Sequence, residues 1–303
     1  MHKFGIQMIK RTLVGTASLV LLLFWGCSDE EYTVQTGANE QAAQRQAVRP
    51  LVAENEEVEV PGTGVSIKLV LVKAGSFVMG DGSQNAPRHN VRLTHDFYMA
   101  TTEVTQGMYK AVYDTSDTPS HFNYSDEHPL EHISHGEALR FCERLSVLTG
   151  YHFELPTEAQ WEYAAYGGAG ASATAYAGGG LLNVLGWYRG NSDTVGYVAT
   201  SEATGRDTML YIRRTSEVAR KAPNALGIYD MSGNVREWCA DSWSELGSEA
   251  ATDPVCTTRT VDKVVRGGAC NDSAQYCRVA WREAIPSGSR GFSIGFRVVV
   301  NVD

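Results

Sequence analysis

The sequence has no run of basic residues. Its 303 residues include 26 Lys and Arg against 35 Asp and Glu, which gives a net charge of −9 at pH 7. Arg213-Arg214 and Arg220-Lys221 are only dipeptides. A protein that binds a polyanion by counterion release needs a basic face. Glycine-rich loops that open a helix after a strand, as nucleotide sites require, are also missing. The sequence therefore predicts neither a nucleic-acid partner nor a nucleotide site.

The chain also lacks an uncharged stretch long enough to cross a bilayer comfortably. Residues 12–26 are rich in Leu and Val and follow a basic start at residues 1–11, which is the pattern of a signal peptide. Cys27 directly follows Gly26, as at a bacterial lipoprotein cleavage site. We therefore expect a signal peptide over residues 1–26 and lipid on Cys27. The mature chain would be anchored by lipid in the bacterial cell envelope and face the periplasm or the cell surface.

Aromatic residues are nearly absent from residues 28–59, where Glu, Gln, Ala and Asn dominate. Such a composition cannot bury enough apolar surface to offset chain entropy. It predicts a disordered tether that, with the lipidated cysteine, covers residues 27–59. Residues 60–303 are enough for one sizeable domain, and no internal repeat is apparent in them.

Two segments of this domain have the spacing of a helix start. Ser134 is followed three residues later by Glu137, and Thr157 by Gln160, and each pair precedes an apolar run with helical periodicity. In such a capping box each side chain accepts a hydrogen bond from the other residue's backbone N–H. The connections between these runs contain much Gly, Asn and Ser. The sequence therefore predicts few helices and many irregular connections.

Residues 223–243 combine turn formers, carboxylates and tryptophans in one short stretch. Asp230, Asn234, Glu237 and Asp241 place oxygen atoms there, and Ca²⁺ usually takes six to eight oxygen ligands, backbone carbonyls included. Asn and Asp also occur in turns because their side chains bond to nearby backbone. The stretch therefore predicts either a calcium loop or a set of ordinary turns.

This stretch and four others follow one another in the order of a known family. The others are FVMG at residues 77–80, EVTQGMY at 103–109, LPTEAQWEYAAYGG at 155–168 and the glycine- and arginine-rich segment at 265–298. Together they resemble the formylglycine-generating enzyme family, also called sulfatase-modifying factors. The resemblance implies an α+β, C-type-lectin-like fold that is loop-rich, with short strands and few helices.

The resemblance also implies a structural calcium ion. In the family, the ion is held by backbone carbonyls and one carboxylate of the loop that matches SGNVRE. These ligands correspond here to Ser232, Gly233, Val235 and Glu237.

Cysteine usage bears on the activity. Besides Cys27 the chain has five cysteines, so at least one is unpaired, in a chain where export would allow disulfides. They are Cys142, Cys239, Cys256, Cys270 and Cys277. Cys142 falls on an apolar helix face and is expected to be a buried free thiol. Cys239 can pair with Cys277, and Cys256 with Cys270, and the sequence leaves this connectivity open.

Oxidases of the family bind Cu(I) through two thiols, a preference expected of that soft ion, and convert a sulfatase cysteine to formylglycine. Their cysteines lie four and nine residues after a Gly-Gly pair. Here the fourth residue after Gly268 is Asp272, the ninth is Cys277, and Cys270 comes only two residues after Gly268. Cys270 and Cys277 are therefore the catalytic candidates if the chain is an oxidase, but they lack the family spacing.

A binding function uses the same terminus. Lectin-like lipoproteins of the family include retroelement-diversified receptors, whose ligand-contacting positions are spread through this last segment. The corresponding side chains here are mostly aromatic or small and polar, which suits an adaptable binding surface. They are Asn271, Asp272, Ser273, Tyr276, Trp281, Ser289, Gly291, Phe292 and Ser293. Trp281 and Phe292 could equally be core residues.

The sequence therefore favours a ligand-binding or accessory module of the envelope, with a protein or glycan at the cell surface as its partner. The alternative is a copper-dependent oxidase acting on a sulfatase. A third reading is an envelope scaffold lipoprotein.

Overall fold

A computed structural model describes residues 50–200 and 207–302. The expected signal peptide, Cys27 and most of the expected tether lie outside the described residues. Within the described part, no helix is both long and apolar enough to cross a membrane.

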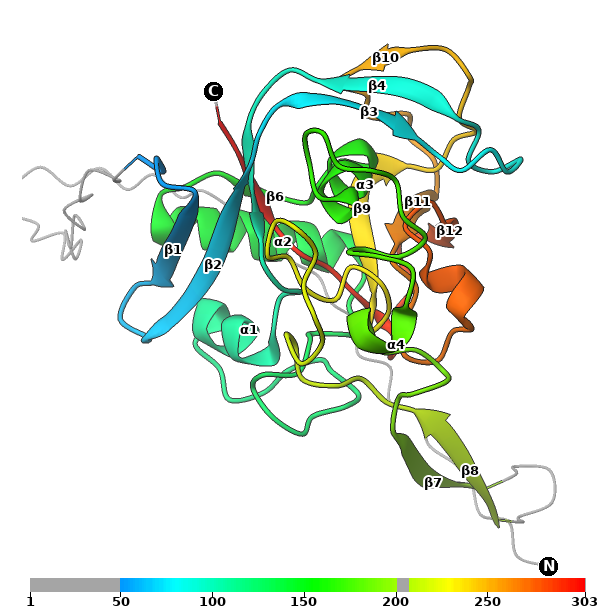
Figure 1. Ribbon diagram of the computed structural model, residues 1–303. Helices are drawn as coiled ribbons and strands as arrows, with labels where there is room; N and C mark the ends of the chain where they lie inside the picture. Colours follow the sequence, from blue (N-terminus) through cyan, green and yellow to red (C-terminus); the bar gives the residue numbers. More distant parts are fainter. Residues whose placement is uncertain (1–49, 201–206, 303) are drawn as a thin grey trace, which may run out of the picture. The chain divides into compact units, whose positions relative to one another are not determined.

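A five-stranded antiparallel sheet contains the first and the last strands of the domain (Figure 1). Its order is β1 (Asn55–Val60), β2 (Val65–Val72), β5 (Phe97–Ala100), β14 (Val299–Asn301) and β6 (Phe153–Glu154). Side chains of β1 alternate between exposed and buried, with Val58 and Val60 in the core. The expected boundary at residue 59 is therefore wrong, because this alternation lets a Glu-rich segment pair with β2 and bury its valines.

Two smaller sheets and a separate hairpin complete the strands. One sheet has the order β10 (Ala251–Thr252), β4 (His89–Leu93), β3 (Gly75–Met79). The other has the order β12 (Arg282–Pro286), β11 (Asp262–Arg266), β9 (Arg236–Ser242), β13 (Ile294–Gly295). The hairpin of β7 (Thr194–Thr200) and β8 (Asp207–Arg213) extends away from the other strands (Figure 1).

The described residues include four α-helices and one 3₁₀ helix. They are α1 (Gln106–Tyr113), α2 (His135–Thr149), α3 (Glu158–Tyr166), α4 (Leu182–Leu185) and η1 (Ala274–Cys277). Helices α2 and α3 begin at the two predicted capping boxes: Ser134 N–H donates to Glu137 Oε2 at 2.9 Å, and Thr157 N–H to Gln160 Oε1 at 2.9 Å. Helices α1 and α4 were not predicted.

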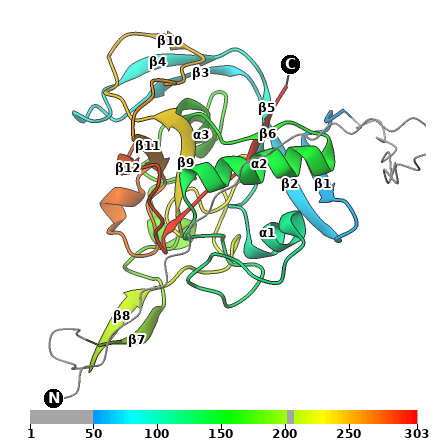
Figure 2. The same cartoon turned by 180° about the vertical axis from the view of Figure 1, so that it is seen from behind.

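Helices α1, α2 and α3 contribute to the two apolar cores of the domain. Helices α1 and α2 pack beside the five-stranded sheet (Figure 2), where Phe141 of α2 stacks edge-on against Phe296 at 5.3 Å. Helix α3 contacts β3, β9 and β11 and buries Trp161 fully in the second core. Short strands, few helices and long connections confirm the predicted α+β, loop-rich fold.

Candidate functional site

The segment that follows β11 turns sharply at Gly268. This residue has a φ of +67°, and a Cβ there would lie 2.5 Å from the carbonyl oxygen of Tyr276 and 2.9 Å from the Cα of Cys277. Only glycine fits so close an approach of two backbones. The turn therefore folds residues 269–277, including η1, back onto the end of β11.

Cys270 and Cys277 lie inside this fold, and both are fully buried. Their sulfur atoms contact carbonyl oxygens, Cys270 that of Arg213 at 3.8 Å and Cys277 those of Ala269 and Ser273 at 3.9 Å. Burial raises the pKa of Cys270, and raises that of Cys277 to about 12. Both side chains are therefore neutral thiols at neutral pH, whereas copper binding and attack need thiolate.

The cysteine pairings considered from the sequence do not form. All five cysteines of the described part are free, and Cys142 is a buried thiol as predicted. Of the pairings that the sequence left open, neither Cys239–Cys277 nor Cys256–Cys270 forms, since all four cysteines are free. The two thiols proposed for copper are fully buried and contact separate backbone carbonyls, so they do not offer Cu(I) a pair of accessible thiolates.

Most of the predicted ligand-contacting side chains reach the surface. Ser273 is exposed, and the partly exposed group is Asn271, Tyr276, Trp281, Ser289, Gly291 and Phe292. The rings of Tyr276 and Trp281 meet edge-to-face at 4.8 Å. Phe292 packs on Phe122 with ring centroids 5.7 Å apart. Neither Trp281 nor Phe292 is a core residue, and each presents part of its ring to solvent.

Asp272 and Ser293 differ from the rest of the set because they are buried and bound to Arg236. One guanidinium nitrogen of Arg236 lies 2.6 Å from Asp272 Oδ1, another donates to Ser293 Oγ at 3.0 Å, and Nε donates to Glu283 Oε2 at 3.0 Å. These two residues therefore tie the segment to β9 and β12 rather than offer groups to a ligand.

A cavity of about 210 Å³ lies between residues 81–86 and residues 278–282. Arg278 forms an ion pair with Asp81 across it, and Nη1 of Arg282 donates to the carbonyl of Asn85 at 3.3 Å. Trp281 also lines the cavity, and its Nε1 is a buried donor with no partner among the described residues. The cavity therefore combines two arginines whose groups are already engaged and one buried donor, Trp281 Nε1, that is left unpaired in the described part. We call the partly exposed side chains of residues 271–292 together with this cavity the binding face.

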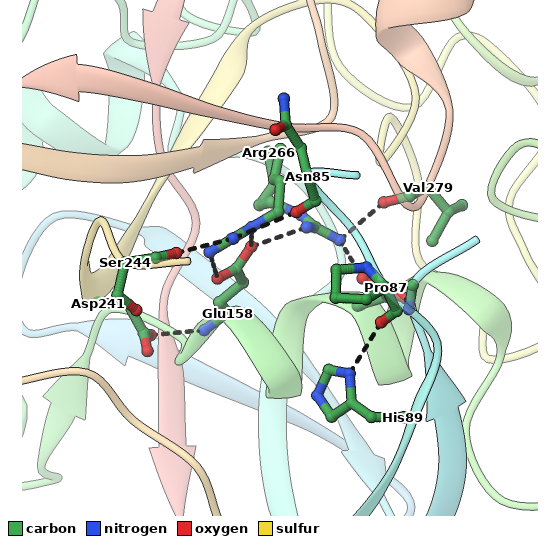
Figure 3. Close-up of polar contacts among 11 residues, drawn as sticks. Asn85, Pro87, His89, Glu158, Asp241, Ser244, Arg266 and Val279 are labelled. Atoms are coloured by element: carbon green, nitrogen blue, oxygen red, sulfur yellow. Dashed lines mark hydrogen bonds and ion pairs between the residues drawn. The ribbon is translucent and has the colours of Figure 1, made fainter. Parts of the chain in front are cut away.

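A network of buried ion pairs around Glu158 and Arg266 (Figure 3) includes Arg282, which lines the cavity. Arg282 contacts both carboxylate oxygens of Glu158 at 2.7 Å, and Arg266 pairs with Glu158 at 2.8 Å and with Glu162. Asp241 accepts from the backbone N–H of Glu158 at 2.7 Å. Two guanidinium groups thus meet two carboxylates in a low-dielectric site, where good hydrogen bonding is needed to offset desolvation. The network fixes Arg282 at the back of the cavity.

Glu131 is a second buried carboxyl that the sequence did not indicate. Its Oε1 accepts from Phe122 N–H at 2.7 Å, and its Oε2 is buried without a partner in the described part. Burial raises the pKa of Glu131 to about 8. Glu131 thus holds the backbone of Phe122 in place, and the ring of Phe122 packs on Phe292 of the binding face.

Known proteins place this architecture in a family. A model of the sulfatase-modifying factor enzyme 1-like domain matches residues 54–302. The chain belongs to this family. "Chaperone protein LppX" of Paenibacillus barcinonensis is 31% identical over 274 residues, which cover 78% of this chain and 90% of that protein. The formylglycine-generating enzyme of Streptomyces coelicolor is 34% identical over 185 residues, 58% of this chain and 54% of the enzyme. The chain thus spans only about half of that enzyme's length.

Solved structures agree with this sulfatase-modifying-factor fold. Treponema denticola variable protein 1 has a TM-score of 0.69 at 26% identity, covering 83% of this chain and all of that chain. PvdO from Pseudomonas aeruginosa has a TM-score of 0.64 at 22% identity, with 83% and 100% covered, and shows the fold alone.

The sulfatase-modifying-factor motifs meet at one buried cluster. Glu237 Oε2 accepts from Trp161 Nε1 at 2.8 Å and from Arg297 Nε at 2.7 Å, while Oε1 accepts from Arg297 at 2.7 Å. Asp230 and Glu103 are buried close by. Three carboxyl groups therefore surround a single guanidinium group, with an excess of acidic groups.

The predicted calcium loop fits a cation at this cluster in part. Asp230 Oδ1 is buried without a partner, and Glu237 Oε1 accepts only one hydrogen bond, although a carboxylate oxygen has two lone pairs. Burial raises the pKa of Asp230 to about 6 and, with repulsion from Asp230 and Glu237, raises that of Glu103 well above its usual range. Side chains alone do not form a metal cluster in the described residues. The predicted ligands, the carbonyls of Ser232, Gly233 and Val235 and the carboxylate of Glu237, stay a prediction, and the unpartnered Asp230 Oδ1 adds one further candidate oxygen.

Proposed function

We propose that this domain is a ligand-binding module of the cell envelope, held to the membrane by lipid on Cys27, and that it does not form formylglycine. The observation that carries the proposal is a contrast in exposure. Cys270 and Cys277 are sealed in the interior, while Trp281 and Tyr276 are partly exposed and Trp281 lines a surface cavity. An oxidase has the opposite need, because its thiols must reach both copper and the substrate.

The proposed ligand is a polypeptide at the cell surface. A relative that matches along 90% of its length is named a chaperone protein, and a structure of 26% identity is named a variable protein. Tryptophan, tyrosine and arginine side chains are the groups that contribute most to protein recognition sites. The binding face combines Tyr276, Trp281 and Phe292 with Arg278 and the Trp281 Nε1.

A light-scattering assay with heat-unfolded citrate synthase tests this proposal. The purified chain is expected to suppress aggregation, and Trp281→Ala is expected to reduce that suppression. Val147→Ala, which alters an 85% exposed side chain on α2, is the matched control and should leave the activity unchanged. Equal suppression by the Trp281 variant and the parent, or no suppression at all, contradicts the proposed face.

The oxidase remains the second candidate, supported by the 34% identity to a formylglycine-generating enzyme. A peptide with a Cys-x-Pro-x-Arg motif, Cu(I) and air would be incubated with the purified chain. We expect no aldehyde by mass spectrometry and no tight copper binding, because both thiols are buried and neutral. Conversion of the peptide that Cys277→Ser abolishes would establish the oxidase instead.

A further inference from the structure

A second and much larger cleft lies away from the binding face. It has a volume of about 1110 Å³ and runs between the β1–β2 turn, α1 and the segments around residues 126 and 218–229. Small-molecule sites usually measure about 300–1,000 Å³. The cleft therefore has room for an oligomeric ligand.

The walls of the cleft are fixed by backbone hydrogen bonds. Tyr229 N–H donates to the carbonyl of Thr101 at 2.8 Å, Gly107 N–H to that of Asp126 at 2.9 Å, and Val218 N–H to that of Glu127 at 2.9 Å. Each of these bonds joins two segments that line the cleft. The cleft is thus formed before any ligand arrives, which lowers the entropic cost of binding.

Hydroxyl groups dominate the polar lining. Seven lining residues are serine or threonine: Thr63, Ser66, Thr101, Thr102, Thr105, Thr115 and Ser116. The hydroxyls of Ser66, Thr101 and Thr102 make no hydrogen bond within the described part of the chain. Each hydroxyl can donate one hydrogen bond and accept two. These side chains are therefore available to a ligand that both donates and accepts.

Charges of both signs are mixed in the cleft. Lys110 pairs with Asp126 at 2.8 Å, and Lys68 lines the cleft without an ion pair in the described residues. Asp114 and Glu127 contribute two further carboxylates. This mixture does not select a strongly charged ligand. An apolar ligand is also disfavoured, because it would leave hydroxyl and charged groups desolvated without partners.

An extended peptide is a poorer match than a sugar. Strand β2, which faces the cleft through Ser66 and Lys68, is paired on one side with β1 and on the other with β5. It therefore has no free edge to which a peptide strand could add. Tyr229 instead contributes a half-buried ring with an apolar face and a polar tip.

We propose that this cleft binds a neutral oligosaccharide, with Tyr229 against a sugar ring and Thr101, Thr102 and Ser66 bonded to its hydroxyls. The proposal does not depend on the function of the binding face.

The test is isothermal titration of the full chain with cellohexaose, maltohexaose, mannohexaose and chitohexaose. At least one is expected to bind. Thr102→Val keeps the shape of the side chain but removes its hydroxyl, and should weaken binding about fivefold, as expected for one lost neutral hydrogen bond. Tyr229→Ala should weaken it further, and circular dichroism checks that this variant folds. Trp281→Ala is the control at the binding face and should bind the sugar as the parent does.

No binding by any of the four sugars at about 10 mM, a concentration at which even weak sites of millimolar affinity fill, overturns the proposal. The proposal is also overturned if a sugar binds, Thr102→Val does not weaken that binding, and Trp281→Ala abolishes it. The sugar would then occupy the binding face and not the cleft. Reduced, unfolded lactalbumin is added to the complex of the chain and a sugar. If it displaces the sugar from the parent and its own binding is lost in Thr102→Val, the cleft is a polypeptide site instead.

Discussion

Replacing Glu131 by glutamine is expected to change how the stability of the domain depends on pH. The carboxyl is fully buried, with Oε1 bonded to Phe122 N–H and Oε2 without a partner among the described residues. Burial raises its pKa from 4.5 to about 8, so the folded protein keeps the proton at neutral pH. Glutamine has the same shape as the protonated acid, keeps an acceptor for Phe122, and cannot ionise.

The size of the effect follows from the two pKa values. Between pH 4.5 and 8 the unfolded chain loses the proton of Glu131 while the folded chain retains it. The folded state therefore binds more protons, and its stability falls as pH rises, by up to about 1.4 kcal/mol per pH unit. Between pH 5 and 8 the loss attributable to this group is on the order of 3 kcal/mol. The stabilisation is complete below pH 4.5 and is gone above about pH 8.

Urea denaturation at half-unit steps from pH 5 to 8 measures this loss. As pH rises, the free energy of unfolding of the parent should fall relative to that of Glu131→Gln. The two proteins should be similarly stable at pH 5, and the variant should be more stable at pH 8. Glu127→Gln changes an exposed carboxyl and is the control. Parallel curves for the parent and Glu131→Gln would show that Glu131 is ionised in the folded domain and would refute the reasoning.

Four further outcomes are expected. Cys27→Ala should move the protein from the membrane fraction to the soluble one, and mass spectrometry finding an unmodified Cys27 in the mature chain would contradict the anchor. Calcium at 100 times its Kd stabilises the folded state by about 2.7 kcal/mol, so removing it with EGTA should lower the melting temperature by about 5–10 °C. Asp230→Asn should remove that sensitivity to EGTA. Identical melting temperatures of the parent with and without EGTA argue against the ion. Arg282→Ala should cost about 1–3 kcal/mol of stability because it leaves Oε2 of the buried Glu158 without a partner while Arg266 still pairs with Oε1, and a loss below 1 kcal/mol by urea denaturation would disprove the network's role. Trp161→Ala, which truncates a fully buried side chain, should lower the free energy of unfolding by about 3–5 kcal/mol. Trp281→Ala, which truncates a partly exposed one, should lower it by no more than about 2 kcal/mol. Equal losses in urea denaturation would mean that Trp281 is a core residue.

The elements that could be predicted from the sequence are those fixed by local interactions. Helices α2 and α3 begin with Ser-x-x-Glu and Thr-x-x-Gln, whose hydrogen bonds span three residues. Helix α1 has a cap of the same geometry, but Met108 sulfur accepts from Thr105 N–H at 3.5 Å where Glu or Gln is usual. Strand β1 was missed because the low hydrophobicity of its surroundings hid the alternation of Glu and Val at residues 56–60.

Only those residues of the candidate site that belong to one continuous segment, residues 271–293, could be predicted from the sequence. No local pattern indicates that residues 81–86 face Trp281 or that Phe292 packs on Phe122, because these contacts join parts of the chain far apart in sequence. The bond from Phe122 N–H to Glu131 lies within an irregular loop, which has no periodicity from which to predict it. Burial of Cys270 could not be predicted either. It depends on the turn at Gly268 and on the carbonyl of Arg213, which comes from the end of β8.

The position of β14 makes completion of the main sheet depend on contacts between distant parts of the chain. This strand, Val299–Asn301, lies between β5 and β6 and pairs with both. Nearby, β13 pairs in parallel with β9. The main sheet is therefore incomplete until β14 pairs with β5 and β6, which precede it by about 200 and about 145 residues, and closing such long loops slows folding. Until β14 pairs, the edges of β5 and β6 that it will occupy are open to misassociation with other chains.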